Sequence, residues 1–253
     1  MDVKQPRESH LAARAPATLG TLKQPKLHWS VTAEQTLRMQ SLRLFEVYNG
    51  HPLSNNDGDP LHASTERVWD IVLAYRIAML GLPLLYGVAS GDAHDFHAGP
   101  RGDSAPGRGW VVVPGSRLSQ DTIADALRGG RFYASTGVSL ARVVEYDGGL
   151  RVEVAEEPGV DCRTEFVGTR RGFSAASRPA RSRGGQLVYA TRRYDDGIGQ
   201  VLATVRGTAT EYAFHPDDLY VRAPAWPISD QRAVLAVNAW ATTTPTAASA
   251  RAE

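Results

Sequence analysis

The clearest candidates for chemistry are Asp92 and His94, which stand two residues apart after an apolar run from Leu84 to Ala89. Side chains at this spacing on an extended segment point to the same side. A carboxylate oxygen and an imidazole nitrogen together suit Zn, Mn or Fe. We therefore predict a divalent metal site at Asp92 and His94. The alternative is a polar turn in which the aspartate caps a neighbouring helix.

Further polar residues follow a second apolar stretch, Leu42–Tyr48, and would supplement this site. Asn49 and His51 come directly after the stretch, whereas Glu46 lies within it and could point inward. An equally open alternative is a tight bend at Asn49 with a solvated His51. His97 could join from the turn after the first pair, and guanidinium groups suit phosphate. The predicted substrate-binding residues are Asn49, His51, His97 and Arg108.

The elements that would position these residues alternate between strands and helices. A helix is predicted to begin at Ser64 or Thr65, and another runs from Ser119 to Leu127 before Gly129. This order predicts an α/β fold with parallel strands, as in part of a (β/α) barrel. Such folds bind ligands where the strands end. The predicted strands are Leu42–Tyr48, Leu84–Ala89, Trp110–Val113 and Phe132–Ser135.

The chain changes character after Gly137. Short apolar stretches alternate with turn formers such as Asp147-Gly-Gly and Asp195-Asp-Gly, and no convincing helix lies among them. This pattern predicts a small antiparallel β-sandwich. The predicted divisions are an irregular segment at 1–20, an α/β domain at 21–139, an antiparallel β domain at 140–241 and a flexible tail at 242–253.

The composition indicates which cellular compartment and which class of ligand to expect. The chain has 253 residues, a formal net charge of +1 and a single cysteine, Cys162. Its most apolar segment, Ile71–Ala89, contains Arg76 and is shorter in unbroken apolar length than the ~20 residues of a membrane span. We expect a cytoplasmic protein without a membrane segment. A near-neutral chain also favours a small phosphorylated molecule over nucleic acid as its ligand.

Five stretches occur in an order and spacing that resemble the C-terminal half of a PHP domain, the polymerase and histidinol phosphatase family of metal-dependent phosphoesterases. The resemblance covers roughly Leu22 to Val138, and the trailing β segment resembles the β region that follows some bacterial PHP domains. The five stretches are Phe45–Pro52, Thr65–Asp70, Leu85–His94, Gly107–Val113 and Ala126–Gly137.

This resemblance implies a distorted barrel that binds two or three metals at its strand ends and hydrolyses phosphoesters. Asp92 and His94 match the family's final Asp-x-His metal motif. Gln24 stands where the family has a metal-binding histidine, and an amide is a poorer ligand than an imidazole. The family's first motif, His-x-His, does not occur before Gln24.

The residues that match the PHP motifs, and the motifs that this sequence lacks, are consistent with two functions. The first is an N-terminally incomplete, metal-dependent phosphoesterase, in which metal-activated water attacks phosphorus. The alternative is a catalytically degenerate binding or scaffold protein. A barrel without its first strands exposes an edge, which predicts a partner chain that covers it.

Overall fold

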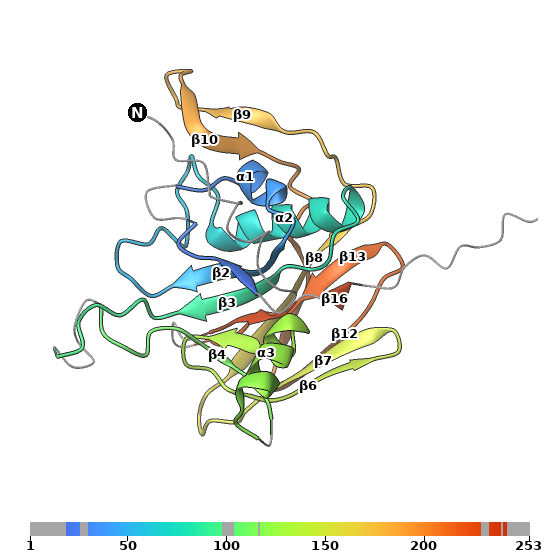
Figure 1. Ribbon diagram of the computed structural model, residues 1–253. Helices are drawn as coiled ribbons and strands as arrows, with labels where there is room; N and C mark the ends of the chain where they lie inside the picture. Colours follow the sequence, from blue (N-terminus) through green and yellow to red (C-terminus); the bar gives the residue numbers. More distant parts are fainter. Residues whose placement is uncertain are drawn as a thin grey trace, which may run out of the picture.

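The computed structural model describes residues 19–25, 30–97, 104–115, 117–228, 233–238 and 240–241. These residues form three helices and sixteen strands (Figure 1). The helices are α1 (Ala33–Arg38), α2 (Thr65–Ala78) and α3 (Gln120–Arg128). The strands are β1 (Gly20–Leu22), β2 (Leu42–Asn49), β3 (Tyr86–Ser90), β4 (Trp110–Val112), β5 (Tyr133–Ser135), β6 (Leu140–Tyr146), β7 (Gly149–Val154), β8 (Cys162–Arg170), β9 (Arg178–Arg181), β10 (Leu187–Arg193), β11 (Gln200–Arg206), β12 (Ala209–Ala213), β13 (Asp218–Arg222), β14 (Ala225–Pro227), β15 (Val234–Val237) and β16 (Trp240–Ala241).

The first three strands form a small parallel sheet that carries two of the helices. β1 pairs in parallel with β2, and β2 pairs in parallel with β3. The helices α1 and α2 lie together beside β2 and β3 (Figure 1). Trp69 and Leu73 of α2 are fully buried in one apolar cluster with Phe45 of β2. Parallel pairing brings the carboxyl ends of β2 and β3 to one edge, where polar residues follow.

Capping residues explain where the helices begin. The hydroxyls of Ser64 and Ser119 each accept a hydrogen bond from the backbone N–H three residues further on. Both predicted helix starts are therefore confirmed. The sequence analysis missed α1, which begins with a capping box in which Thr32 and Gln35 bond each other's backbone N–H groups.

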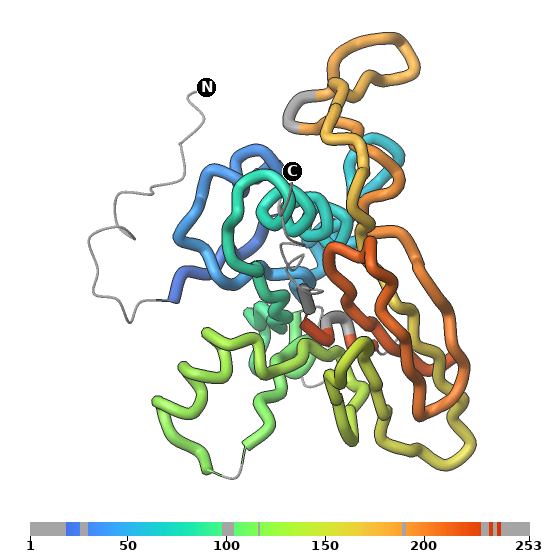
Figure 2. The backbone as a smooth tube through the Cα atoms, turned by 90° about the vertical axis from the view of Figure 1, so that its right-hand side faces the viewer, coloured from blue at the N-terminus to red at the C-terminus, as the bar shows by residue number. Residues whose placement is uncertain are grey.

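Most of the remaining strands form antiparallel sheets. An eight-stranded sheet has the order β16-β13-β8-β14-β15-β5-β4, with β11 also paired to β8. A three-stranded sheet, β12-β7-β6, packs against it through an apolar cluster that includes Leu150, Val152, Phe166 and Val221. The hairpin of β9 and β10 forms a separate two-stranded sheet, which extends away from the other elements (Figures 1 and 2).

The predicted α/β fold with a partial (β/α) barrel is wrong. β4 and β5 pair antiparallel with each other, and β5 pairs antiparallel with β15. The described residues are therefore mainly β, with three parallel strands and no TIM-like barrel. The intervening helix α3 buries only Ala126, so it does not cover a sheet face as the crossover helix of a parallel unit does. The expected partner chain, which no contact in this structure tests, stays a prediction.

The predicted domain boundaries can be compared with the structure only in part. The tail at 242–253 and nearly all of the segment at 1–20 lie outside the described residues. The eight-stranded sheet combines strands from both sides of residue 140, where the boundary was predicted. Within the described ranges, no helix is both long and apolar enough to cross a membrane. The cytoplasmic location stays a prediction.

Candidate functional site

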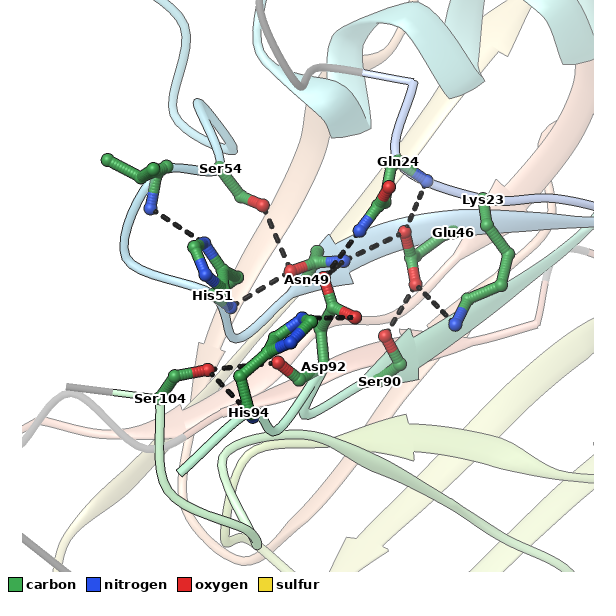
Figure 3. A network of polar contacts seen from close by, with 11 residues as sticks. Lys23, Gln24, Glu46, Asn49, His51, Ser54, Ser90, Asp92, His94 and Ser104 are labelled. Atoms are coloured by element: carbon green, nitrogen blue, oxygen red, sulfur yellow. Dashed lines mark hydrogen bonds and ion pairs between the residues drawn. The ribbon is translucent and has the colours of Figure 1, made fainter. Parts of the chain in front are cut away.

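Polar side chains from the ends of all three parallel strands meet in one network (Figure 3). Gln24 follows β1, Asn49 ends β2, and Asp92 follows β3. The structure thus brings together three residues that are far apart in the chain, Gln24 and Asp92 by 68 positions and Asn49 and Asp92 by 43. Parallel pairing causes this convergence, since it places all three strand ends at the same edge of the sheet.

The innermost member of the network is Glu46, whose side chain is fully buried. Its Oε2 accepts hydrogen bonds from the Gln24 backbone N–H (2.5 Å) and from Asn49 Nδ2 (3.2 Å). Its Oε1 accepts from the Ser90 hydroxyl (2.5 Å) and lies 3.8 Å from the Lys23 ammonium. A buried carboxylate needs such donors to offset its lost hydration. Glu46 therefore anchors the edge of the sheet.

Asp92 forms the next layer outward. Its Oδ2 accepts hydrogen bonds from Gln24 Nε2 (2.5 Å) and Asn49 Nδ2 (3.1 Å). Burial raises the pKa of Asp92, but the hydrogen bonds from Asn49 and Gln24 lower it by more, so that the pKa lies below its ordinary value. Asp92 is therefore ionised at neutral pH, with one oxygen held by two amides and Oδ1 left on the outer side.

Two imidazole rings stand at this outer side. His94 Nε2 lies 3.6 Å from Asp92 Oδ1, and the His94 side chain is 66% exposed. The His51 ring meets the His94 ring edge to face, with centroids 5.3 Å apart. The Leu53 backbone N–H donates to His51 Nδ1 (3.2 Å), so the neutral His51 ring carries its proton on Nε2. His51 is thus set up as a hydrogen-bond donor and not as an Nε2 metal ligand.

Loop hydrogen bonds hold these rings in place. Asn49 Oδ1 accepts from the His51 backbone N–H (2.9 Å). The Ser104 hydroxyl donates to the Asp92 carbonyl (3.0 Å), and the His94 backbone N–H donates to the Ser104 carbonyl (3.0 Å). These bonds fix the backbone of both loops, from which the side chains of His51 and His94 extend.

The two other predicted site residues differ in position. Arg108 lies beside the network, because a Cβ added to Gly50 would stand 2.7 Å from the Arg108 Cβ. Gly50 is thus the residue that allows the two loops to approach each other. His97 is exposed, and no hydrogen bond or ring contact joins it to another residue in the described ranges. Substrate binding by His97 and Arg108 stays a prediction.

The donor set limits which metal centre the site can hold. In the part of the chain that the structure describes, no three His, Cys, Asp or Glu side chains are grouped closely enough to hold one ion. Asp92 Oδ1 and His94 Nε2 form a pair, and ligand atoms about 2.0–2.1 Å from one tetrahedral ion stand roughly 3.3–3.5 Å apart. Their separation of 3.6 Å therefore suits a single ion. The residues do not fit the two- or three-metal centre that the PHP resemblance implies.

The sequence analysis missed several members of the network. It named Glu46 only as a residue that could point inward, and it gave no role to Lys23, Ser90 or Ser104. Ser90 stands two residues before Asp92 at the end of the same strand, which is a signal that could have found it. Ser104 carries no such signal, because a loop brings it back to the site.

Comparisons with known proteins identify no relative. No protein-family model, no curated protein and no solved structure matches this chain. Its function must therefore be argued from the site itself.

Proposed function

We propose that this chain binds a small phosphorylated molecule together with one divalent metal ion. The observation that carries this proposal is the pair of Asp92 Oδ1 and His94 Nε2, 3.6 Å apart, at the outer edge of a hydrogen-bonded network. Carboxylate and imidazole together suit Zn, Mn or Fe. With two protein ligands, such an ion keeps open positions, which phosphate oxygens and water fill in many metal–phosphate sites.

The charges around the pair favour a metal with its phosphate over a phosphate alone. Asp92 Oδ1 lies 3.6 Å from His94 Nε2, and the buried Glu46 side chain lies behind Asp92 in the same network. Negative charge at this pair attracts a cation and repels a bare anion. The Nε2–H of His51 and the neighbouring Arg108 then supply donors for the phosphate oxygens.

Hydrolysis of the bound phosphoester is the second candidate. The metal would supply a water of lowered pKa. The observation that favours hydrolysis is the Nε2–H of His51, which can donate a hydrogen bond to the leaving oxygen and stabilise the negative charge that develops there. The sequence resemblance to PHP phosphoesterases supports the same candidate. A binding protein without turnover is the alternative.

Thermal unfolding tests the binding proposal. We expect Mn²⁺ with phenyl phosphate to raise the unfolding temperature more than either alone, because a ligand at 100 times its Kd stabilises the native state by about 2.7 kcal/mol. Asp92→Asn and His94→Ala should abolish the shift. Asp57→Asn and His215→Ala, which change exposed residues of the same types outside the network, should preserve it.

Two outcomes would contradict the proposal: no shift with the wild-type chain, or an equal loss of the shift in the control variants. Release of phosphate from a generic ester then separates enzyme from binding protein. Turnover that requires Mn²⁺ and falls at least about tenfold in His51→Ala, with the thermal shift retained, would establish hydrolysis.

A further inference from the structure

The near-neutral charge of the whole chain conceals one strongly basic segment. Residues 166–193 contain seven arginines and no Asp, Glu or Lys. Since the chain has a formal net charge of +1 and this segment contributes +7, the rest of the chain carries −6. Charge segregated in this way produces a local positive potential that the net charge does not reveal.

Much of this charge lies on the hairpin of β9 (Arg178–Arg181) and β10 (Leu187–Arg193), here called the arginine ribbon together with its turn. The ribbon is anchored at its base, where Thr191 Oγ1 donates to the Leu61 carbonyl (3.3 Å). Its other end projects from the body of the protein (Figures 1 and 2). The turn is closed by a hydrogen bond from the Ser182 N–H to the Gln186 carbonyl (2.9 Å).

Three arginines of the ribbon lack acidic partners, whereas Arg192 Nε lies 3.8 Å from Glu34 Oε1. Arg178, Arg181 and Arg183 are exposed, and no ion pair joins them to a carboxylate among the described residues. Arg178 and Arg193 stand directly opposite each other on the two strands. Like charges in such a cross-strand pair are destabilising. At Arg178, Arg181 and Arg183, the ribbon therefore presents positive charge that no acidic side chain of the described residues neutralises.

We infer that the arginine ribbon binds the phosphate backbone of double-stranded DNA. The B-DNA major groove, about 12 Å wide, admits a two-stranded β-ribbon, whereas the major groove of A-form RNA is too deep and narrow for it. Guanidinium groups bind phosphates through paired N–H donors. Among the ribbon side chains that the structure describes, Leu187 is the one large apolar side chain that is exposed, at 63%. That is little apolar area to insert into a membrane surface.

Binding through phosphates makes a quantitative prediction for salt dependence. Each phosphate neutralised changes the slope of log K against log salt by about −0.9. Three contacts, from Arg178, Arg181 and Arg183, give an expected slope of about −2.7. This binding is independent of base sequence and of metal, so it is separable from the proposed function at Asp92.

Fluorescence anisotropy with a labelled duplex of about 25 base pairs tests the inference between about 50 and 200 mM salt. The triple variant Arg178→Gln, Arg181→Gln, Arg183→Gln should lose at least about tenfold in affinity and close to three units of slope. The matched control changes three exposed arginines elsewhere and should change affinity less than about twofold. The control substitutions are Arg117→Gln, Arg142→Gln and Arg206→Gln.

A single variant, Arg183→Gln at the turn, guards against a folding defect and should reduce the slope by about one unit. Equal losses in the triple variant and its control would overturn the inference, as would binding that does not depend on salt. Equal or tighter binding to vesicles containing phosphatidylglycerol, or to duplex RNA, would also overturn it and assign the ribbon to that partner.

Discussion

Asp92 and Gln24 share a backbone conformation that is unfavourable for their residue types. They are the two non-glycine residues with positive φ among the described residues, at +47° and +50°. Such a conformation costs roughly 1–3 kcal/mol per residue and concentrates at binding sites. The two side chains are hydrogen-bonded to each other. Strain at both partners of one contact supports a functional role for this edge of the sheet.

The substitution Gln24→His should complete a stronger metal site. The side chain at position 24 already reaches Asp92, within 2.5 Å, and histidine tolerates a positive φ better than most residues. Imidazole is a better ligand for Zn²⁺ than an amide, and catalytic zinc sites have three protein ligands. We expect Gln24→His to tighten Zn²⁺ binding by about tenfold or more, as measured by competition with a chromophoric chelator.

Gln24→Ala is the control for that experiment, because it removes the amide without supplying a ligand. It should not tighten Zn²⁺ binding. Equal affinities in Gln24→His and Gln24→Ala would show that position 24 does not face the ion.

At the scale of elements, the starts of two helices could be predicted from the sequence. The pairing and relative direction of the strands could not. Ser64 and Ser119 identified their helices because capping depends on neighbouring residues alone. The short strand β9 was missed, since it contains Pro179 and spans only Arg178–Arg181. The pairing of β5 with β15 joins segments about a hundred residues apart, which no local pattern encodes.

Part of the candidate site could also be predicted from the sequence, namely which residues lie together but not how they are hydrogen-bonded. Asn49, Asp92 and His94 could be grouped because each follows or ends an apolar strand, and parallel strands end at one edge. The hydrogen bonds that fix Glu46 and the proton position on His51 could not be predicted. They depend on backbone geometry in loops, where a single N–H group decides the outcome.

The turn after β10 should contribute stability that depends on pH. Asp195 accepts hydrogen bonds from the Gly197 N–H (2.8 Å) and the Ser174 N–H (2.6 Å), which lower its pKa. A carboxylate with a lowered native pKa stabilises the fold above its unfolded pKa of about 3.9, and this stabilisation is lost as pH falls through the native pKa. Asp195→Asn should therefore lower the urea midpoint at neutral pH.

The difference between wild type and Asp195→Asn should shrink as pH falls below about 4. Urea unfolding followed by circular dichroism at several pH values measures it. A difference that stays constant down to about pH 3 would show that the charge on Asp195 contributes nothing.

At the scale of the whole molecule, one buried ion pair links the parallel sheet's helix α2 to the large antiparallel sheet. Arg222 of β13 makes a paired contact with Asp70 of α2, through Nε and Nη2 at 2.9 Å each. Burial lowers the pKa of Arg222, but Asp70 and Glu66 raise it by more, so the guanidinium stays charged. Its Nη1 has no hydrogen-bond partner in the described structure.

Removal of Asp70 should therefore destabilise the protein strongly. Asp70→Asn removes the buried carboxylate that pairs with Arg222 and leaves Glu66, 2.9 Å from Arg222 Nη2, as its remaining acidic partner. Breaking a buried pair typically costs 3–5 kcal/mol, and we expect a loss of about 3 kcal/mol. Asp125→Asn breaks an exposed pair with Arg128 and should cost about 1 kcal/mol or less. Denaturant unfolding compares the two variants, and similar losses would show that the Asp70–Arg222 pair does not hold the two parts together.

The most direct test of the account is the number of Mn²⁺ ions bound per chain, measured from the electron paramagnetic resonance signal of free Mn²⁺ in the presence of phenyl phosphate. The account predicts one ion per chain for the wild type and for the double variant Asp57→Asn, His215→Ala. It predicts none for the double variant Asp92→Asn, His94→Ala. No uptake by the wild-type chain, or equal uptake by both double variants, would contradict the assignment of this site.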